Sequence, residues 1–437
     1  MKPKHKLFSA KLRMALIAIL MLAGSVSATA QTQSVIYRFK DPSDGSNPAG
    51  GLISDSAGNF YGTTCNGGPG GYAGNGTVFE LTQQGGKWIK TSIDAFSEGS
   101  SRCPEENLTF DQAGNLYGAT VSGGTNDLGT VFRLTPQGNT WTFSLIYSFQ
   151  GGAADGEYPE GGLVFDKTGN LFGATIRGGN SSCQDGCGTV FQLTPSQGGN
   201  WTETVIHFFG HGNDGATPFA SPIVDDKGNL FGTTHAGGTA GDGTVFKLDA
   251  PATQGGAWTE HVLHNFQGAP DGDGPNALIF DPKGNLDGTT TLGGTANGTI
   301  FQLTRGKDGA WTESVLYSFC SQSNCPGGDG TGPSGGLAFD RTGKLYGTTE
   351  SGGSGGFCQG EYNCGTVFEL APPTTQGGAW TETVLYNFTN GKDGWGPEAG
   401  LILGKFGVLY GTTTKGGNEG KNCTFNVGCG TVFKVKL

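Results

Sequence analysis

Short apolar runs bounded by Gly, Asn or Asp follow one another along the chain from residue 32 to its end. In one representative unit they lie within residues 162–175, 188–193 and 201–208, and they are rich in Val, Ile, Leu, Thr and Phe. This pattern is typical of short β-strands joined by tight turns. Each unit holds four such runs, which we name strands a to d; the first range contains both a and b.

The unit recurs seven times along the chain. Its Gly-Thr-Val/Ile-Phe element contains Thr77, Thr130, Thr189, Thr244, Thr299, Thr366 and Thr431, at a mean spacing of about 59 residues. Four-stranded units at so long a period are typical of propeller blades, because solenoid repeats are shorter. The pattern therefore predicts an all-β fold, namely a seven-bladed β-propeller of four-stranded blades.

The two ends of the repeat complement each other. The seventh unit stops after its third run, residues 430–437, so its strand d is missing. Residues 32–39 match the complete strand d at residues 312–319 position by position. We therefore expect the N-terminal strand to complete the last blade and close the ring, which leaves no blade half-built.

Tandem units that read Gly-Asn-Leu-Tyr-Gly-Thr-Thr, Gly-Gly and Gly-Thr-Val-Phe resemble the GloVer repeat of exported bacterial choice-of-anchor proteins, over residues 32–437. Members of that family commonly carry a C-terminal surface-sorting tail, whereas this chain ends inside a predicted strand. The resemblance therefore implies release rather than anchoring. The family is defined by its repeat, and the resemblance implies no activity for particular residues.

Composition supports the all-β class. Gly accounts for 83 of 437 residues, charged residues for 14% and aromatic residues for 11%. So much Gly disfavours long helices, and so many aromatic residues supply more buriable surface than disordered chains carry.

The first thirty residues are typical of a cleavable secretory signal. Five basic residues between Lys2 and Arg13 precede an apolar run over residues 14–24, and Ala28-Thr29-Ala30 follows. The run is too short to span a membrane. We therefore expect residues 1–30 to be removed and residues 31–437 to form one propeller domain, secreted to the extracellular space or the periplasm.

Removal of this segment leaves 21 basic against 37 acidic residues, a net charge of −16. A protein this negative repels nucleic acid and anionic membrane surfaces, so neither is an expected partner. We expect a monomer with no membrane span, no cofactor and no bound metal.

All ten cysteines are expected to form disulfides, because the chain is predicted to be exported. Four pairs each lie within one loop, and the remaining two cysteines fall on the same face of the ring. The expected pairs are Cys65–Cys103, Cys183–Cys187, Cys320–Cys325, Cys358–Cys364 and Cys423–Cys429. The alternative is a zinc site, but the spacings within the loops, without clustered His, do not match one.

One face of the predicted ring is built from variable loops. The b–c loops there range from 3 to 12 residues, whereas the a–b turns on the other face hardly vary. Binding usually resides in variable loops on a rigid scaffold. Aromatic residues that depart from the repeat fall in these loops: Tyr72, Tyr158, Phe357, Tyr362, Trp395 and Phe425. They could stack on sugar rings, or they could pack within small cores of the loops themselves.

Blade 4 alone places two histidines, His211 and His235, on the variable face, where they could be neighbours. One interpretation is a metal or proton-transfer role, and the other is unpaired surface histidines. His261 and His264 lie three residues apart on one strand, so they should point to opposite faces and cannot share a metal.

Several other recurring or unusual residues have structural interpretations. Six loops carry an Asp four residues before a Pro, which we interpret as a turn residue rather than a calcium ligand: Asp44, Asp155, Asp214, Asp271, Asp329 and Asp393. Six Trp residues at one strand-d position are expected to pack. Asp287 replaces a Phe or Tyr of the repeat and should be buried between blades.

Two functions fit such a protein. A secreted binding or scaffold protein that recognises an extracellular polymer such as a glycan needs only the variable face. An extracellular carbohydrate-active hydrolase or lyase would need paired carboxylates near the ring axis, or a metal. The innermost strand carries mostly Gly, Ala, Ser and Pro, with Glu106, Glu160 and Glu398 as exceptions, so the non-enzymatic function is favoured.

Overall fold

The computed structural model describes residues 32–40, 42–68, 74–96, 101–179, 183, 185–253, 255–295, 297–320, 328–354, 358, 364–375, 377–389, 391–417, 423 and 428–437. The chain divides into two units, Met1–Thr32 and Gln33–Leu437, and the fold below is that of the second. The expected secretory segment, residues 1–30, lies outside the described residues. Within the described part of the chain, no helix is both long and apolar enough to cross a membrane.

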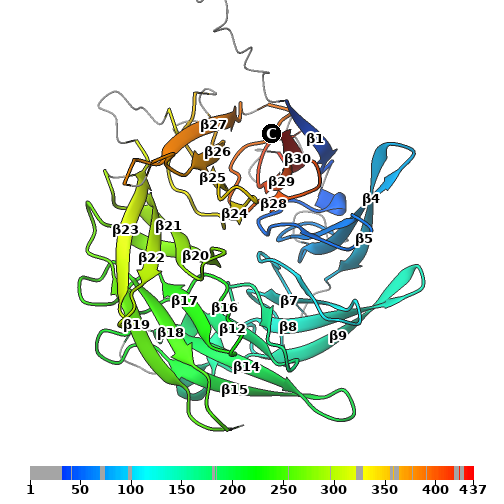
Figure 1. Cartoon of the computed structure of the whole chain (residues 1–437). Coiled ribbons are helices and arrows are strands. Elements are labelled where there is room, and N and C mark those ends of the chain that lie inside the picture. Colours follow the sequence, from blue (N-terminus) through cyan, green and yellow to red (C-terminus); the bar gives the residue numbers. More distant parts are fainter. Residues whose placement is uncertain are drawn as a thin grey trace, which may run out of the picture. The chain divides into compact units, whose positions relative to one another are not determined.

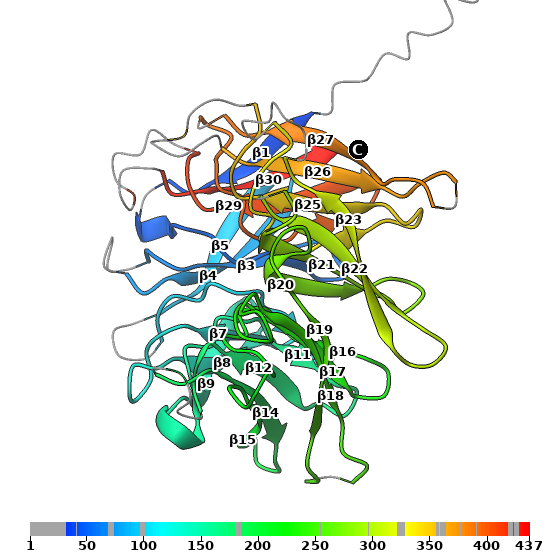
Figure 2. The same cartoon turned by 90° about the vertical axis from the view of Figure 1, so that its left-hand side faces the viewer.

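Seven four-stranded antiparallel sheets follow one another around an axis (Figures 1 and 2), which confirms the predicted propeller. From the inner to the outer strand, blade 1 consists of β2 (Ile53–Ser54), β3 (Phe60–Thr64), β4 (Thr77–Gln84) and β5 (Lys87–Ala95), and blade 2 of β6 (Thr109–Phe110), β7 (Leu116–Thr120), β8 (Thr130–Gln137) and β9 (Thr140–Ser148). Blade 3 consists of β11 (Val164–Phe165), β12 (Leu171–Thr175), β14 (Thr189–Pro195) and β15 (Trp201–Phe208), and blade 4 of β16 (Ile223–Val224), β17 (Leu230–Thr234), β18 (Thr244–Asp249) and β19 (Thr259–Asn265). Blade 5 consists of β20 (Asp273–Phe280), β21 (Leu286–Leu292), β22 (Thr299–Arg305) and β23 (Trp311–Ser318), and blade 6 of β24 (Ala338–Phe339), β25 (Leu345–Thr349), β26 (Thr366–Ala371) and β27 (Thr381–Asn387).

Blade 7 joins the two ends of the propeller. It consists of β28 (Ile402–Leu403), β29 (Val408–Thr413), β30 (Thr431–Lys436) and, from the other end of the chain, β1 (Gln33–Arg38). A two-stranded sheet of β10 (Gly156–Glu157) and β13 (Arg177–Gly178) and two 3₁₀ helices, η1 (Pro42–Asp44) and η3 (Gly152–Ala154), lie in loops.

The N-terminal strand completes the last blade, as predicted. β1 pairs with β30 from Gln33 opposite Val435 to Arg38 opposite Thr431 (Figure 1). Closer to the axis, Thr412 Oγ1 on β29 donates a hydrogen bond to the carbonyl of Gly50, ahead of blade 1, at 3.2 Å. Blade 7 is thus complete and is joined to blade 1.

Neighbouring blades are also joined by a phenylalanine pair that recurs seven times. The Phe that follows each strand d meets the strand-c Phe of the next blade edge-on, with ring centroids 5.1–5.3 Å apart. The pairs are Phe39–Phe79, Phe96–Phe132, Phe149–Phe191, Phe209–Phe246, Phe266–Phe301, Phe319–Phe368 and Phe388–Phe433. Edge-to-face pairs add about 0.5–1.5 kcal/mol to the burial of the rings. Phe39 supplies the pair between blades 7 and 1.

A glycine in each strand b makes room for the strand-c ring. A Cβ on Gly173 would lie 2.5 Å from Cζ of Phe191, and the corresponding distances in the other blades are 2.5–2.7 Å. The repeated Gly is therefore a steric requirement of the blade. The six repeated Trp side chains are half-buried and pack as expected. The ring centroid of Trp201, for example, lies 5.8 Å from that of Tyr117 in the preceding blade.

Four of the five expected disulfides lie wholly within the described residues, and all four are confirmed: Cys65–Cys103, Cys183–Cys187, Cys358–Cys364 and Cys423–Cys429. Cys320 is disulfide-bonded as well, and its expected partner Cys325 lies outside the described residues. Among the described residues no cysteine is free. The alternative zinc interpretation of these cysteines is not supported.

Deletion of residues 33–39 should destabilise the whole propeller. It removes β1 and the ring of Phe39, exposes the edge of β30, and should lower the Tm and promote aggregation. Thermal melts and light scattering measure both effects. A synthetic peptide of residues 32–39 should restore part of the Tm, and the same peptide with Phe39→Ala should restore less. An unchanged Tm after deletion would contradict closure by this strand.

Candidate functional site near the ring axis

A proline recurs between each strand d and the innermost strand of the next blade, except in blade 5, where Pro275 lies within the innermost strand β20. A Cβ on Gly129 would lie 2.4 Å from Cδ of Pro159 in the next blade, and the equivalent distances in the other blades are 2.5–2.8 Å. These glycines also have φ values of 91–103°, which L side chains rarely adopt. The proline of each blade is therefore held against the preceding blade.

The residue after this proline differs from blade to blade. In blades 1 to 7 it is Ala49, Glu105, Glu160, Phe219, Asn276, Ser334 and Glu398, and we call this set, together with Glu106 and Glu350, the axial site. Neighbouring segments touch: the Gly162 amide donates a hydrogen bond to Ser221 Oγ at 2.7 Å. The residues that follow the prolines lie a few residues before the innermost strand of their blade or, for Asn276, within the innermost strand β20.

Carboxyl groups from different blades influence one another at the axial site. Burial is the largest cause that raises the pKa of Glu106 to about 8, and the charges of Glu105 and Glu160 add to it. Burial and the charge of Glu160 raise the pKa of Glu105 to about 7. Burial and the charge of Glu350 raise the pKa of Glu398 to about 7, and Glu105, two blades away, adds to this. Near neutral pH these groups therefore carry protons part of the time, and they can donate as well as accept hydrogen bonds.

Aromatic rings lie on one side of the axial site. Phe219 is 42% exposed, and its ring centroid lies 6.3 Å from that of His235, which is also exposed. In the neighbouring blade the Arg177 guanidinium lies 5.6 Å from the ring of the half-buried Tyr158. Burial raises the pKa of Glu160, and Arg177 partly opposes this rise. Blades 3 and 4 thus bring an aromatic face, a carboxyl group and a guanidinium to one region.

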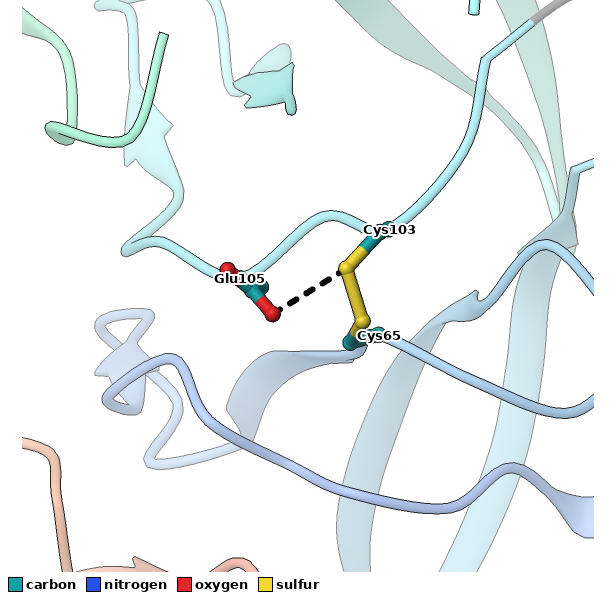
Figure 3. Close-up of side chains that lie close together, drawn as sticks. All are labelled: Cys65, Cys103 and Glu105. Carbon is teal, nitrogen blue, oxygen red and sulfur yellow. Dashed lines mark hydrogen bonds between the residues drawn. A yellow bond between two sulfur atoms is a disulfide. The ribbon is translucent and has the colours of Figure 1, made fainter. Parts of the chain in front are cut away.

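A disulfide holds the acidic loop of blade 2. Cys65, directly after β3, is bonded to Cys103, and Glu105 follows two residues later. Figure 3 shows the Glu105 carboxyl group turned toward the disulfide, with Oε1 3.1 Å from Sγ of Cys103. The bond ties the segment that carries Glu105 and Glu106 to blade 1.

Comparison with known families agrees with the repeat pattern. The Gloeobacter/Verrucomicrobia repeat matches residues 25–184 and 180–425. The chain belongs to this repeat family. No curated protein matches its sequence.

Solved structures resemble this Gloeobacter/Verrucomicrobia repeat protein at low identity. The extracellular domain of a protein named as a hybrid two-component system from B. thetaiotaomicron is 14% identical, with a TM-score of 0.53; the match covers 93% of this chain. The chain spans 42% of that structure's length. Pseudomonas fluorescens PhoX in complex with vanadate is 12% identical, with a TM-score of 0.47 over 93% of this chain and 95% of that one. The first likeness supports the propeller fold.

Trp395 is buried, which corrects the interpretation that its ring faces solvent. It is 4% exposed and packs in a core that contains Cys358 and Cys364. The Lys415 ammonium lies 4.5 Å from the centroid of its ring. Trp395 therefore follows the alternative interpretation, packing within the loops. Four other aromatic candidates lie outside the described residues: Tyr72, Phe357, Tyr362 and Phe425.

The two histidines of blade 4 are both exposed. The amide of His211 donates a hydrogen bond to Asp214 Oδ2 at 3.2 Å, whereas His235 lies beside Phe219. Among the described residues, neither belongs to a group of three or more potential metal ligands. The expected separation of His261 and His264 is confirmed, because they contact different carboxylates, Asp249 and Asp271 respectively.

The six repeated Asp residues hold their loops, as predicted. Each accepts a hydrogen bond from a backbone amide that lies four to nine residues earlier in the chain. Asp155, for example, accepts one from Gln150 at 2.6 Å. Their role in turn geometry is therefore established.

A groove of about 950 Å³ lies between blades 3 and 4 on the opposite face, where the a–b turns lie. Trp258 and Phe172 are its aromatic lining residues. Its carboxylates are engaged: Asp225 accepts hydrogen bonds from its own turn, and Asp226 contacts the Lys167 ammonium at 2.8 Å. The axial site, whose carboxyl groups come from several blades, is therefore the better candidate.

The sequence pattern pointed to part of the axial site, namely Glu106, Glu160 and Glu398, and to Tyr158 and His235 beside it. It did not point to Phe219 or Glu105. The residue that follows each loop proline is the signal that would have found both.

Asp287 is fully buried, as predicted. One carboxylate oxygen accepts a hydrogen bond from Gln302 at 2.9 Å, and the other has no partner among the described residues. Burial raises its pKa from 3.8 to about 7.

Asp287→Asn should therefore stabilise the protein above neutral pH. The folded state keeps a proton that the unfolded chain releases near pH 3.8, so the stability contribution of Asp287 falls as the pH rises from there to about 7. The loss is about 1.4 kcal/mol per unit of pKa difference. Thermal melts should show a higher Tm for the variant at pH 8 and a similar Tm at pH 4. The same Tm difference at both pH values would contradict a buried, protonated Asp287.

Proposed function

We propose that the protein is an exported binding module that recognises an extracellular glycan at the axial site of the loop face. The observation that carries the proposal is the exposed ring of Phe219 on the blade next to Glu160, with Arg177 close to that carboxyl group. Sugars offer apolar faces that stack on aromatic rings, and hydroxyl groups that exchange hydrogen bonds with carboxyl and guanidinium groups.

The charge of the site favours neutral or amino-sugar polymers. The charge of Glu160 raises the pKa of Glu105 and of Glu106, and the charge of Glu105 also raises that of Glu106, so an anionic polymer would add to the same repulsion. A protonated amino group or a neutral hydroxyl would instead reduce it. The net negative charge of the predicted mature chain also repels anionic polymers.

Export is part of the same proposal. Residues 1–30 would act as a cleaved secretory signal, and the mature monomer would work outside the cytoplasm. The disulfides support this location, because such bonds persist in oxidising compartments.

Phe219→Ala should weaken glycan binding by about 5- to 150-fold, since truncation of an exposed stacking ring commonly costs about 1–3 kcal/mol. Binding is measured by calorimetry with a panel of neutral, amino-sugar and uronic-acid polysaccharides. The matched control is Phe406→Ala, because Phe406 is 94% exposed in the turn between β28 and β29 on the other face. Equal losses in the two variants, or tightest binding to the uronic-acid polymers, would contradict the proposal.

A second candidate function is a carbohydrate-active hydrolase or lyase. The observation that favours it is the pKa of Glu105, raised to about 7, beside Glu106 at about 8. A carboxyl group that is protonated near neutral pH can act as a general acid toward a glycosidic oxygen.

Glu105→Gln and Glu106→Gln separate the two functions. If the site is catalytic, wild-type protein should release reducing ends from a polysaccharide that it binds, and at least one variant should lose this activity by about 100-fold or more while still binding. Asp226→Asn, on the opposite face, is the control. Binding without any product from the wild type would remove the enzymatic alternative and leave the binding function.

A further inference from the structure

A three-residue arrangement recurs between neighbouring blades, away from the axial site. Each copy contains a Tyr or His of strand d, the Asp of the loop that follows, and a strand-d residue of the next blade. We call each such set an outer station. Four stations end in Glu: Tyr147–Asp155–Glu203, His207–Asp214–Glu260, His264–Asp271–Glu313 and Tyr317–Asp329–Glu382.

Each of these four stations brings two carboxyl groups together. Burial and the charge of the facing Asp raise the pKa of Glu203 and of Glu382 to about 8. In all four Glu residues, Oε1 is buried without a hydrogen-bond partner among the described residues. The stations therefore hold two neighbouring carboxyl groups each, with oxygen ligands that make no hydrogen bond among the described residues.

The station between blades 7 and 1 shows how the chain satisfies this charge elsewhere. Lys90 occupies the position of the Glu, and its ammonium lies 3.1 Å from Oδ1 of Asp44. A cation held beside the loop Asp is thus compatible with the geometry of the propeller.

The station of His264 differs from the tyrosine stations in its donor atoms. His264 Nε2 lies 3.1 Å from Asp271 Oδ2, and one potential ligand atom from each of His264, Asp271 and Glu313 lies within 4.8 Å of the other two. Asp271 Oδ1 and Glu313 Oε1 are buried without partners among the described residues. The side chains of His264 and Asp271 are 21% and 16% exposed, so an ion can reach them from solvent.

We propose that His264, Asp271 and Glu313 bind a divalent first-row transition metal ion such as Zn²⁺. One imidazole nitrogen and two carboxylate oxygens are ligands that these ions accept, with water in the remaining position. Ligand atoms around a tetrahedral Zn²⁺ lie about 3.3 Å apart, given bonds of about 2.0–2.1 Å. The 3.1 Å between His264 Nε2 and Asp271 Oδ2 already fits this spacing. The Glu313 carboxylate, now within 4.8 Å, needs only a small shift toward them. The ion would join β19 of blade 4 to β23 of blade 5.

Tyrosine at position 264 is the variant that tests the nitrogen ligand with least disturbance. Tyr147 and Tyr317 occupy the same place in other blades, where each O–H donates a hydrogen bond to the loop Asp at 2.9 and 2.7 Å. Burial and the facing Asp raise the pKa of both phenols, so a tyrosine there stays protonated and is a poor metal ligand. His264→Tyr should therefore fold and lose the ion.

The experiment uses untagged protein freed of metal with a chelator and titrated with Zn²⁺. We expect one tightly bound ion per chain, a higher Tm with Zn²⁺, and a loss of affinity of at least about 100-fold in His264→Tyr. His207→Tyr is the matched control, because His207 Nε2 lies 3.6 Å from Asp214 Oδ2 and, among the described residues, this station forms no close group of three potential metal ligands. Unchanged Zn²⁺ affinity in His264→Tyr, or no binding by the wild type, would overturn the proposal.

A second pair of variants tests the oxygen ligand. Glu313→Gln should weaken binding and alter the visible absorption of the Co²⁺-substituted protein, whereas Glu382→Gln, at a tyrosine station, should change neither. Equal effects of the two variants would mean that Glu313 is not a ligand. None of these measurements requires a glycan, so the result is independent of the function proposed for the axial site.

Discussion

The edge-to-face contact between phenylalanines of neighbouring blades is the interaction on which the propeller depends. Its seven copies have nearly the same geometry, with centroids 5.1–5.3 Å apart. An open row of blades would leave a large apolar ring in water at each end, at a cost of about 1.5–3 kcal/mol for each exposed side chain. Closure removes both costs, because Phe39 reaches blade 1 from the strand that also completes blade 7. The pairing of the two chain ends is therefore a requirement of packing as well as of hydrogen bonding.

Repeated contacts fix the backbone at the same points in every blade, and a few side chains can then vary without changing the fold. The glycine and proline that meet between blades leave the next residue free to be Ala, Glu, Phe, Asn or Ser. The outer stations likewise accept Tyr or His beside the loop Asp. Both candidate sites thus arise from substitutions at positions that the repeat holds in place but does not specify.

The two sites share one electrostatic feature, which is that folding brings carboxyl groups together and partly removes them from water. At the axial site the groups come from blades 2, 3, 6 and 7, and Arg177 and Lys415 partly compensate their charge. At the outer stations they come from adjacent blades, and between blades 7 and 1 Lys90 takes the place of the Glu. Where the chain supplies no cation, a proton, a ligand or a metal ion has to balance the charge.

The sequence alone determined the strands, the number of blades, the closing strand and the burial of Asp287. These features depend on short apolar runs bounded by turn residues and on a repeat that aligns equivalent positions of the blades. Both can therefore be recognised without coordinates. It did not reveal that Trp395 is buried, because loop residues follow no period and their exposure depends on which other loops cover them. Nor could it show that the segment after Glu160 lies against the segment after Phe219, or that His264 lies near Glu313, since these residues lie on different blades. Only the tertiary structure decides such contacts, because the tilt of each blade and its packing against the next set which side chains meet.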